Sequence, residues 1–462
     1  MTVKALMPVP ILNLVAPLPH KGTAMHTADT AGQAPGWSGA VATVIGGSPR
    51  HGDVDSANNR STRPTTRGIR TSTTATRTTT TRVLSCAPEL SADPDLFDKL
   101  VAAYIDCLRS KRSSKSASVF EAKAERNLCD LHDELISGEY QPGRSICFVI
   151  TRPKPREVWA ADIRDRIVHR LLYNQVMERF HNAFTADSCA CIPGRGTLYA
   201  AKRLEHQVRS VTHNWSKPAH YLKCDLANFF VSINKHVVFE LLARRITEPW
   251  WLRLAHTVLM HDPRGDVEVR GNAQLLRLVP PHKSLFNAPD DHGLPIGNLS
   301  SQFFANVLLD VLDKRVKHTL KAPHYVRYVD DFVLVHESSQ WLNHVLRDVT
   351  DFLPERLSLG LNPSKTILQP VDRGIDFVGQ VIKPWCRTTR PRTLRNAYRR
   401  LHETPADDLF EVGNSYLGLV RQASKGHAEQ ARIANVLRLR GHCVKADLSK
   451  CYRIRSDHVS HL

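Results

Sequence analysis

The sequence has no run of about 18 uninterrupted apolar residues, which is the least that spans a membrane as a helix. Its most apolar stretch, residues 5–19, is interrupted by prolines, whereas the hydrophobic part of a signal peptide should be helical. Of the 10 cysteines only Cys189 and Cys191 are close together, and no further pair stands at zinc-ligand spacing. These absences predict a cytoplasmic protein with reduced thiols, no membrane partner and no zinc site.

What the sequence has in excess is positive charge, with 63 Lys and Arg against 45 Asp and Glu and a net charge of +18. Such an excess raises the chance that the partner is a polyanion, of which nucleic acid is the commonest, without deciding it. A chain of 462 residues is long enough for two or three lobes.

Residues 1–85 differ in composition from the rest of the chain. Gly, Ala, Ser, Thr and Pro dominate there, residues 61–82 form a Thr/Arg tract, and no helical or strand periodicity is present. We predict a disordered low-complexity tail. Its arginines could add weak contacts with RNA, although a solvated tail or an over-long start of the reading frame is the simpler interpretation.

Apolar periodicity predicts the elements of the ordered part. Helices are expected at 96–107, 119–137, 164–184, after Asn234, at 300–320 and from 392 onward, strands at 145–151 and 221–225, and a β-hairpin at 325–336.

Acidic residues stand where two of these apolar elements end. Asp330 and Asp331 lie between the two strands of the hairpin, and Asp225 ends the strand 221–225. Adjacent carboxylates beside apolar strands repel each other, and a divalent cation with oxygen ligands relieves that repulsion. Either acid segment alone could be a turn or a helix cap, but together they predict a magnesium site with three carboxylates.

Two further segments suggest contacts with a nucleotide. Gly293 and Gly297 lie in a Gly-x-Pro-x-Gly loop, where they would permit close backbone approach to a flat ligand, and Ser300 or Ser301 would cap the helix that follows. The cations Arg152, Lys154 and Arg156 alternate after a strand, which suits a triphosphate but also a solvated edge.

Taken in order, these segments resemble the reverse transcriptase family, and within it the enzymes of diversity-generating retroelements. The resemblance runs from about residue 96 to 423. Its motifs are Pro-Lys-Pro-Arg-Glu-Val-Trp-Ala-Ala-Asp and the residues after it at 153–169, residues 186–194, Asp-Leu-Ala-Asn-Phe-Phe at 225–230, Gly-Leu-Pro-Ile-Gly-Asn-Leu-Ser-Ser-Gln at 293–302, Tyr-Val-Asp-Asp at 328–331, Leu-Asn-Pro-Ser-Lys-Thr at 361–366, Asp-Phe-Val-Gly at 376–379 and Asn-Ser-Tyr-Leu-Gly at 414–418.

The resemblance implies roles for individual residues. Asp225, Asp330 and Asp331 match the metal-binding catalytic carboxylates, and the carbonyl of Leu226 could also touch a metal. Phe230 matches the aromatic gate against the ribose 2′-hydroxyl. The positions that match nucleotide contacts are Lys154 and Arg156 on the triphosphate, Ile296, Gly297 and Gln302 near the template base pair, and Lys365 as a suggested proton donor to pyrophosphate.

Ile296 departs from the pattern of many reverse transcriptases, which have Gln there. A hydrophobic residue at this position resembles the hallmark of the error-prone retroelement class. The alternatives are a group II-intron-like or antiphage-defence reverse transcriptase, or, in another class, a catalytically inert RNA-binding cofactor.

The resemblance implies an α+β right-hand polymerase fold with an antiparallel palm sheet and a helical thumb. We expect N-terminal helices and fingers at 86–215, the palm at 216–383, and a basic thumb with a C-terminal tail at 384–462. The chain would extend a primer on template RNA, using deoxynucleoside triphosphates and two Mg²⁺ ions, for which Mn²⁺ could substitute. A small basic accessory protein is a further implied partner.

Overall fold

Helices precede the first strand, as the apolar spacing predicts. The computed structural model describes residues 93–111, 115–152 and 154–453, so the predicted tail at 1–85 lies outside the described residues. The first helices are α1 (Leu96–Lys111), α2 (Lys115–Glu121) and α3 (Ala124–Ser137). The single helix expected at 119–137 was wrong. Neither Gly nor Pro marks the break after Glu121, so the local sequence carries no signal for it.

A three-stranded sheet follows these helices. Strand β1 (Ser145–Ile150) confirms an expected strand and pairs antiparallel with β2 (Arg156–Ala161) and parallel with β4 (Val267–Val269). Strand β2 was not expected, because its inward positions include a charged residue: Glu157 is buried and accepts hydrogen bonds from the Trp159 indole and the Leu285 amide. A buried carboxylate breaks the alternation of apolar and polar residues by which strands are recognised.

The sheet that carries the acidic residues has the strand order β5-β6-β3-β7, and every neighbouring pair in it is antiparallel. Its strands are β3 (His220–Asp225), β5 (Tyr325–Tyr328), β6 (Asp331–His336) and β7 (Ile367–Pro370). The expected strand at 221–225 and the expected hairpin are therefore confirmed.

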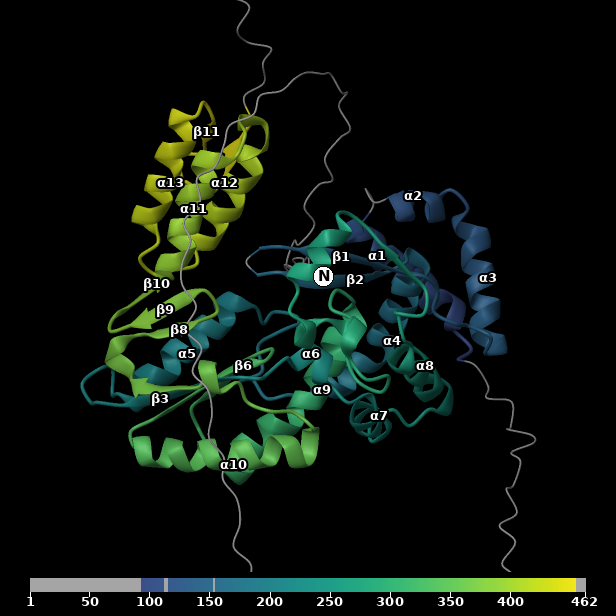
Figure 1. Cartoon of the computed structure of the whole chain (residues 1–462), viewed down its shortest axis with the longest axis horizontal. Coiled ribbons are helices and arrows are strands. Elements are labelled where there is room, and N and C mark those ends of the chain that lie inside the picture. Colours follow the sequence, from purple (N-terminus) through teal and green to yellow (C-terminus); the bar gives the residue numbers. More distant parts are fainter. Residues whose placement is uncertain (1–92, 112–114, 153, 454–462) are drawn as a thin grey trace, which may run out of the picture. The chain divides into compact units, whose positions relative to one another are not determined.

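Side chains on the two faces of this sheet belong to different apolar clusters. Leu222 and Cys224 pack into the core that includes α9 and α10, whereas Tyr221 and Val333 pack into a second core that includes α5. Alternate residues of a strand point to opposite faces, so Asp225 and Asp331 share the face of Tyr221 and Val333. Helix α10, green in Figure 1, packs against the two central strands β3 and β6.

Helices connect and cover the strands. Their bounds are α4 (Ile163–His181), α5 (Thr197–Val211), α6 (Phe229–Ser232), α7 (Lys235–Ala243), α8 (Pro249–Met260), α9 (Leu299–Lys314), a π-helical turn η4 (Arg315–Thr319) and α10 (Ser339–Leu357). Short 3₁₀ turns are η1 (Ala273–Leu278), η2 (Pro281–Lys283), η3 (Leu285–Asn287), η5 (Pro363–Lys365) and η6 (Val371–Arg373). The expected helices near 164–184, after Asn234 and at 300–320 are confirmed, the last as α9 followed by η4.

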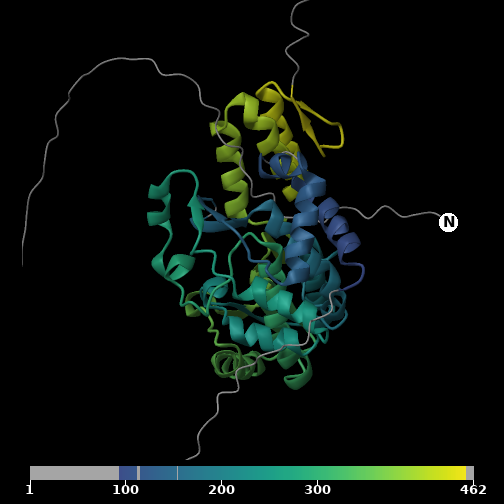
Figure 2. The ribbon, with the colours of Figure 1, turned by 90° about the vertical axis from the view of Figure 1, so that its right-hand side faces the viewer.

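The C-terminal part begins with a second antiparallel sheet and continues as helices, which lie side by side in the ribbon views (Figures 1 and 2). The strands are β8 (Ile375–Phe377), β9 (Gln380–Lys383) and β10 (Cys386–Thr389), and the helices are α11 (Pro391–Glu403), α12 (Ala406–Val420) and α13 (His427–Leu439). These helices pack around their own apolar cluster, which includes Leu401, Leu417 and Leu437. A small hairpin of β11 (Cys443–Val444) and β12 (Cys451–Tyr452) follows, which the expectation of helix from 392 onward did not include.

No helix among the described residues is long and apolar enough to cross a membrane. The boundaries expected for fingers, palm and thumb stay a prediction.

Candidate active site

Strand pairing brings the three predicted carboxylates to one end of the four-stranded sheet. Asp225 is the register partner of Asp331 in the β3–β6 pair. Asp330 lies in the turn between β5 and β6, and its carbonyl accepts a hydrogen bond from the Leu226 amide at 3.1 Å. Two segments that are far apart in the sequence therefore meet where the sequence analysis expects them to.

The surroundings of Asp330 and Asp331 disfavour the charged forms of these two carboxylates. Burial, followed by the charge of Asp225, raises the pKa of Asp330. Burial raises the pKa of Asp331 to about 6, although Lys223 opposes the shift. The Oδ1 atom of Asp331 is buried and has no hydrogen-bond partner among the described residues. A positive charge brought to this end of the sheet would relieve all three effects.

Lysine ammonium groups supply part of that charge. Lys365 Nζ lies 2.5 Å from Asp225 Oδ1. Lys223 Nζ lies 3.1 Å from Asp331 Oδ2 and donates to the Asp376 carbonyl at 2.7 Å. Sequence reasoning missed Lys223, although a signal was present: it precedes Asp225 by two residues in a strand, so both side chains point to one face.

The donor set at this end of the sheet fits a hard divalent cation. Carboxylate oxygens are the ligands that magnesium prefers, and the buried Asp331 Oδ1 has no hydrogen-bond partner among the described residues. Among the residues that the structure describes, no three Asp, Glu, His or Cys side chains converge closely enough to hold a metal ion. Lys365 and Lys223 instead hold oxygens of Asp225 and Asp331, so a bound cation would take the place of these ammonium groups.

The predicted triphosphate contacts lie at the start of β2. The Lys154 and Arg156 side chains are both exposed. The positive charge of Arg156 acts to lower the pKa of Asp330, so its guanidinium is within electrostatic reach of the acid cluster. This relation across the chain supports a shared site.

The Gly-x-Pro-x-Gly loop is hydrogen-bonded to β2 and packs closely against it. The Trp159 amide donates to the Ile296 carbonyl at 2.7 Å, and a Cβ added at Gly297 would lie 2.7 Å from the Trp159 carbonyl. A Cβ at Gly293 would lie 2.6 Å from a methyl of Leu285. Both glycines have positive φ. These glycines therefore permit a close approach between the loop and neighbouring protein atoms, and their approach to a ligand stays a prediction.

The expected cap of the next helix was wrong. Helix α9 begins at Leu299, and Ser300 and Ser301 lie inside it with buried side chains. Asn298 precedes the helix, but its Oδ1 accepts from the Ala161 amide at 3.2 Å instead of capping the helix. Tertiary contact with β2 outweighs the local preference. The predicted contact residue Gln302 is half-buried in the first turn of α9.

Phe230 lies in α6, directly after the acid-bearing strand. Its ring is half-buried and meets Phe229 edge to face, with centroids 5.2 Å apart. Its carbonyl accepts from the Leu294 amide at 2.8 Å. The predicted gate is thus hydrogen-bonded to the same loop that carries Ile296.

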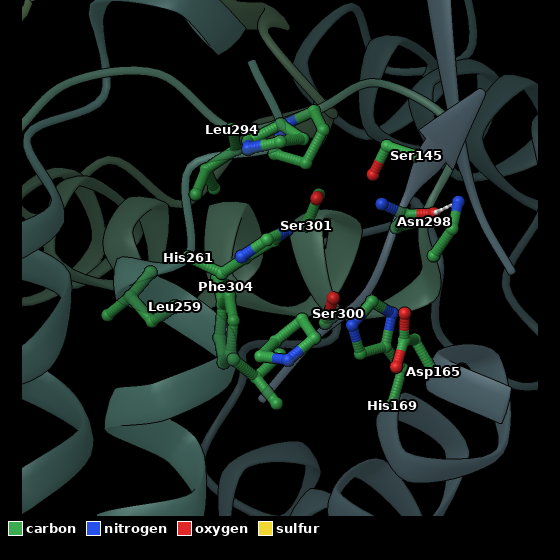
Figure 3. A pocket seen from close by; sticks show the side chains of 15 residues that line it. Ser145, Asp165, His169, Leu259, His261, Leu294, Asn298, Ser300, Ser301 and Phe304 are labelled. Carbon is green, nitrogen blue, oxygen red and sulfur yellow. Dashed lines mark hydrogen bonds between the residues drawn. The ribbon is translucent and has the colours of Figure 1, made fainter. Parts of the chain in front are cut away.

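A cavity of about 20 Å³ lies beneath this loop (Figure 3). Its lining includes His169, His261 and Pro295. The Nδ1 of His169 and the Nε2 of His261 are buried and have no hydrogen-bond partner in the part of the chain that the structure describes. A space of this size holds a single water molecule when polar groups line it. Burial, with a contribution from His261, lowers the pKa of His169 to about 3, so its ring stays neutral. Sequence reasoning singled out neither histidine.

Comparison with known proteins decides the family. The profile described as "Reverse transcriptase (RNA-dependent DNA polymerase)" matches residues 152–382, which is half of the chain. The chain belongs to the reverse transcriptase family. Its α+β architecture, with an antiparallel sheet carrying the acids and helices around it, is the polymerase fold expected from the sequence.

Two curated proteins are distant relatives. Protein YkfC of Escherichia coli (strain K12) is 23% identical over 296 residues, which cover 57% of this chain and 72% of YkfC. The putative COX1/OXI3 intron 2 protein of Saccharomyces cerevisiae (strain ATCC 204508 / S288c) is 20% identical over 304 residues, which cover 54% of this chain and 33% of that protein.

Solved structures with detectable likeness include two telomerases. Telomerase from Candida albicans, in complex with a TWJ fragment of telomeric RNA, has a TM-score of 0.39 and 11% identity, with coverage of 67% of this chain and 64% of that chain. Apo telomerase from Candida tropicalis, truncated from its C-terminal domain, has a TM-score of 0.38 and 13% identity, with coverage of 55% and 58%.

Proposed function

We propose that this reverse transcriptase is an active RNA-directed DNA polymerase that copies an RNA template into cDNA. The observation that carries the proposal is the cluster of Asp225, Asp330 and Asp331 at one end of the sheet. Two of these carboxyls have raised pKa values, and one oxygen of Asp331 lacks a partner. Groups perturbed in this way are typical of catalytic sites.

Asp225, Asp330 and Asp331, with the carbonyl of Leu226, would hold the metal ions. When bound, two Mg²⁺ ions, or Mn²⁺ in their place, supply the positive charge that activates a primer hydroxyl and neutralises charge on the departing pyrophosphate. A metal ion bound to Asp225 would displace the Lys365 ammonium from that carboxylate, so Lys365 would be free to protonate the departing pyrophosphate.

The other residues bind and select the nucleotide. Lys154 and Arg156 are exposed and positively charged, so they would bind the triphosphate oxygens. Phe230 would form a wall against the 2′-hydroxyl of a ribonucleotide. Ile296, Gly297 and Gln302 would lie against the nascent base pair, with the position of Ile296 set by its hydrogen bond to β2.

Primer extension tests the proposal. The purified chain should extend a DNA primer on an RNA template with deoxynucleotides and magnesium, and a chelator should stop the reaction. The variant Asp330→Asn with Asp331→Asn should lose roughly three orders of magnitude in rate while still binding the duplex. A matched control is Asp348→Asn, which removes a carboxylate of the Arg315–Asp348 ion pair between η4 and α10. A wild-type chain that binds RNA but extends no primer would support the inert cofactor instead.

Within this function we propose the error-prone, retroelement type, with a structured template RNA and a small basic accessory protein as partners. Its support is Ile296, which has no side-chain hydrogen-bonding group next to the base pair. The intron-type alternative is favoured by the name of the yeast relative, of which the chain covers only 33%. A near-duplicate pair of repeats in the neighbouring DNA that differ at adenines would support the retroelement type, and its absence would favour the intron or antiphage types.

A further inference from the structure

The guanidinium of Arg327 uses all five of its N–H donors in a place that solvent does not reach. Its side chain is 0% exposed, as is that of its ion-pair partner Asp313. Its Nε and one terminal nitrogen donate to the two oxygens of Asp313, each at 2.7 Å. The remaining bonds go to Ser188 Oγ at 2.8 Å, Asn306 Oδ1 at 3.2 Å and the carbonyl of Val329 at 3.1 Å.

The bond to Val329 reaches the turn that presents the acids. Val329 has φ of +56°, a left-handed conformation that is rare for a β-branched residue. Residues held in such a conformation cost on the order of 1–3 kcal/mol and persist only where the surroundings impose it. Asp330 and Asp331 follow directly, so the direction of their carboxylates depends on this turn.

The other ends of the Arg327 network are fixed in the core. Asp313 and Asn306 belong to α9, and Asp313 also accepts from the Tyr325 hydroxyl at 2.7 Å. The Cys189 amide donates to the Arg327 carbonyl at 2.9 Å, which ties β5 to the segment before α5. The turn carbonyl is therefore bonded to a side chain that cannot itself move without breaking four buried hydrogen bonds to protein.

We propose that Arg327 is a positioning residue of the polymerase site: it imposes the strained turn at Val329 and so sets the geometry of Asp330 and Asp331 for cations. The role rests on the proposed function of the acid cluster. It requires arginine, because lysine has three donors and no planar fork, so it could keep the charge pair with Asp313 but not all five bonds.

The test compares conservative variants with a matched control. Arg327→Lys keeps the charge, while Arg327→Met with Asp313→Leu removes both members of the pair and leaves no unpaired buried charge. Arg315→Lys is the control, because Arg315 also makes a two-bonded pair, with Asp348, between η4 and α10. The readouts are Mn²⁺ binding without nucleotide, followed by the paramagnetic resonance signal of free Mn²⁺, and kcat and KM for deoxynucleotides.

We expect Arg327→Lys to weaken Mn²⁺ binding by about 10–100-fold, as loss of an orienting group does at metal sites, and to lower kcat with KM nearly unchanged. The double variant should behave alike, and Arg315→Lys should match wild type. Adding Val329→Gly to Arg327→Lys should restore part of the Mn²⁺ affinity, because glycine adopts positive φ without cost.

A folded Arg327→Lys protein with wild-type Mn²⁺ affinity and kcat would overturn the proposal. So would a loss that Val329→Gly does not relieve, because that result would assign Arg327 a general role in stability. If the wild type fails to extend primers, the proposed function fails, whereas the Mn²⁺ comparison still decides the role of Arg327.

Discussion

The Asp313–Arg327 pair and the Asp225–Lys365 pair both join a strand of the same sheet to a neighbouring segment, but their surroundings are opposite. Both side chains of the first pair are 0% exposed, and every donor of the guanidinium is used. In the second pair Lys365 is 44% exposed, and the adjacent Asp331 has an oxygen without a partner. The first pair is complete without a ligand, while the second leaves charge for a ligand to neutralise. The contrast separates a carboxylate that is fully paired within the fold from carboxylates that we propose to bind metal ions.

The two ion pairs should differ most in what they contribute to the free energy of unfolding. Asp313→Ala leaves the Arg327 charge buried and unpaired, so we expect a loss of about 3–5 kcal/mol in unfolding free energy. Asp331→Asn removes a carboxylate whose charge burial disfavours, so without metal its melting temperature should equal or exceed that of wild type. Denaturant titration and thermal melts of both variants measure the difference. Equal losses of stability in Asp313→Ala and Asp331→Asn would show that both carboxylates stabilise the fold alike.

Selection of the sugar should depend on the open side of the site. Phe230→Ala removes the aromatic wall, and we expect discrimination against ribonucleotides to fall by about 10–200-fold. Single-nucleotide incorporation with matched ribo- and deoxynucleotides gives the ratio, and Phe229→Leu, at the buried neighbouring ring, is the control for packing. An unchanged ratio in the alanine variant would place the gate elsewhere.

The buried histidine under the loop should make stability depend on pH. The folded state holds the pKa of His169 at about 3, below its unfolded value of about 6.5, so the unfolded chain binds more protons below pH 6.5. His169 should therefore cost about 2 kcal/mol of stability between pH 7 and pH 5. The loss should be smaller by this amount in His169→Gln, measured by denaturant titration at both pH values. Parallel pH profiles in the two proteins would contradict a neutral buried ring.

Fidelity should respond more weakly, at Ile296. Glutamine at this position would offer an amide to the correct base pair, which is worth about 1 kcal/mol and about fivefold in selectivity, most visibly opposite template adenine. Sequencing of cDNA made from one template by wild type and Ile296→Gln provides the error spectra. Identical error spectra, with a uniformly lower rate of incorporation in the variant, would show that Ile296 only packs within the loop.

The smallest effect is expected from the N-terminal segment. Removal of residues 1–85 should leave the rate of primer extension within about twofold, because that segment contributes no motif residue. The comparison uses the full chain and the truncated chain on one template over a range of salt. A loss of activity in a folded, truncated protein would show that the arginines of this segment contribute to RNA binding.

The acid-bearing strands could be predicted because their signal is local. Strand 221–225 and the hairpin consist of short apolar runs that end in acids, and the structure places Asp225 and Asp331 as register partners. Strand β2 gave no such signal, since Glu157 faces inward, and the inward carboxylate is satisfied by an amide from residue 285. Its burial is decided by a partner more than a hundred residues away, which periodicity within a window does not report.

The residues around the acids show the same limit. Strand alternation could have predicted that Lys223 lies beside the acids. The role of Arg327 could not be predicted in this way, because its partners come from α9 and from the segment before α5. The prediction that Ser300 or Ser301 caps α9 was wrong for a related reason, because the contact of Asn298 with β2 determines where that helix begins. Sequence motifs therefore predict the acidic residues, whereas the residues that position them are determined by contacts between distant parts of the chain.

Cys224 directly precedes Asp225 of the acid cluster in the chain, yet it points to the opposite face of the sheet and is 1% exposed. Burial raises the pKa of its thiol to about 12, so it stays protonated and does not react with alkylating reagents at neutral pH. Among the described cysteines, Cys129 and Cys443 are exposed. They lie in α3 and β11, away from the motifs. Of the described cysteines, these two should therefore react first with maleimide dyes, which would give the protein native handles for fluorescence measurements outside the acid cluster.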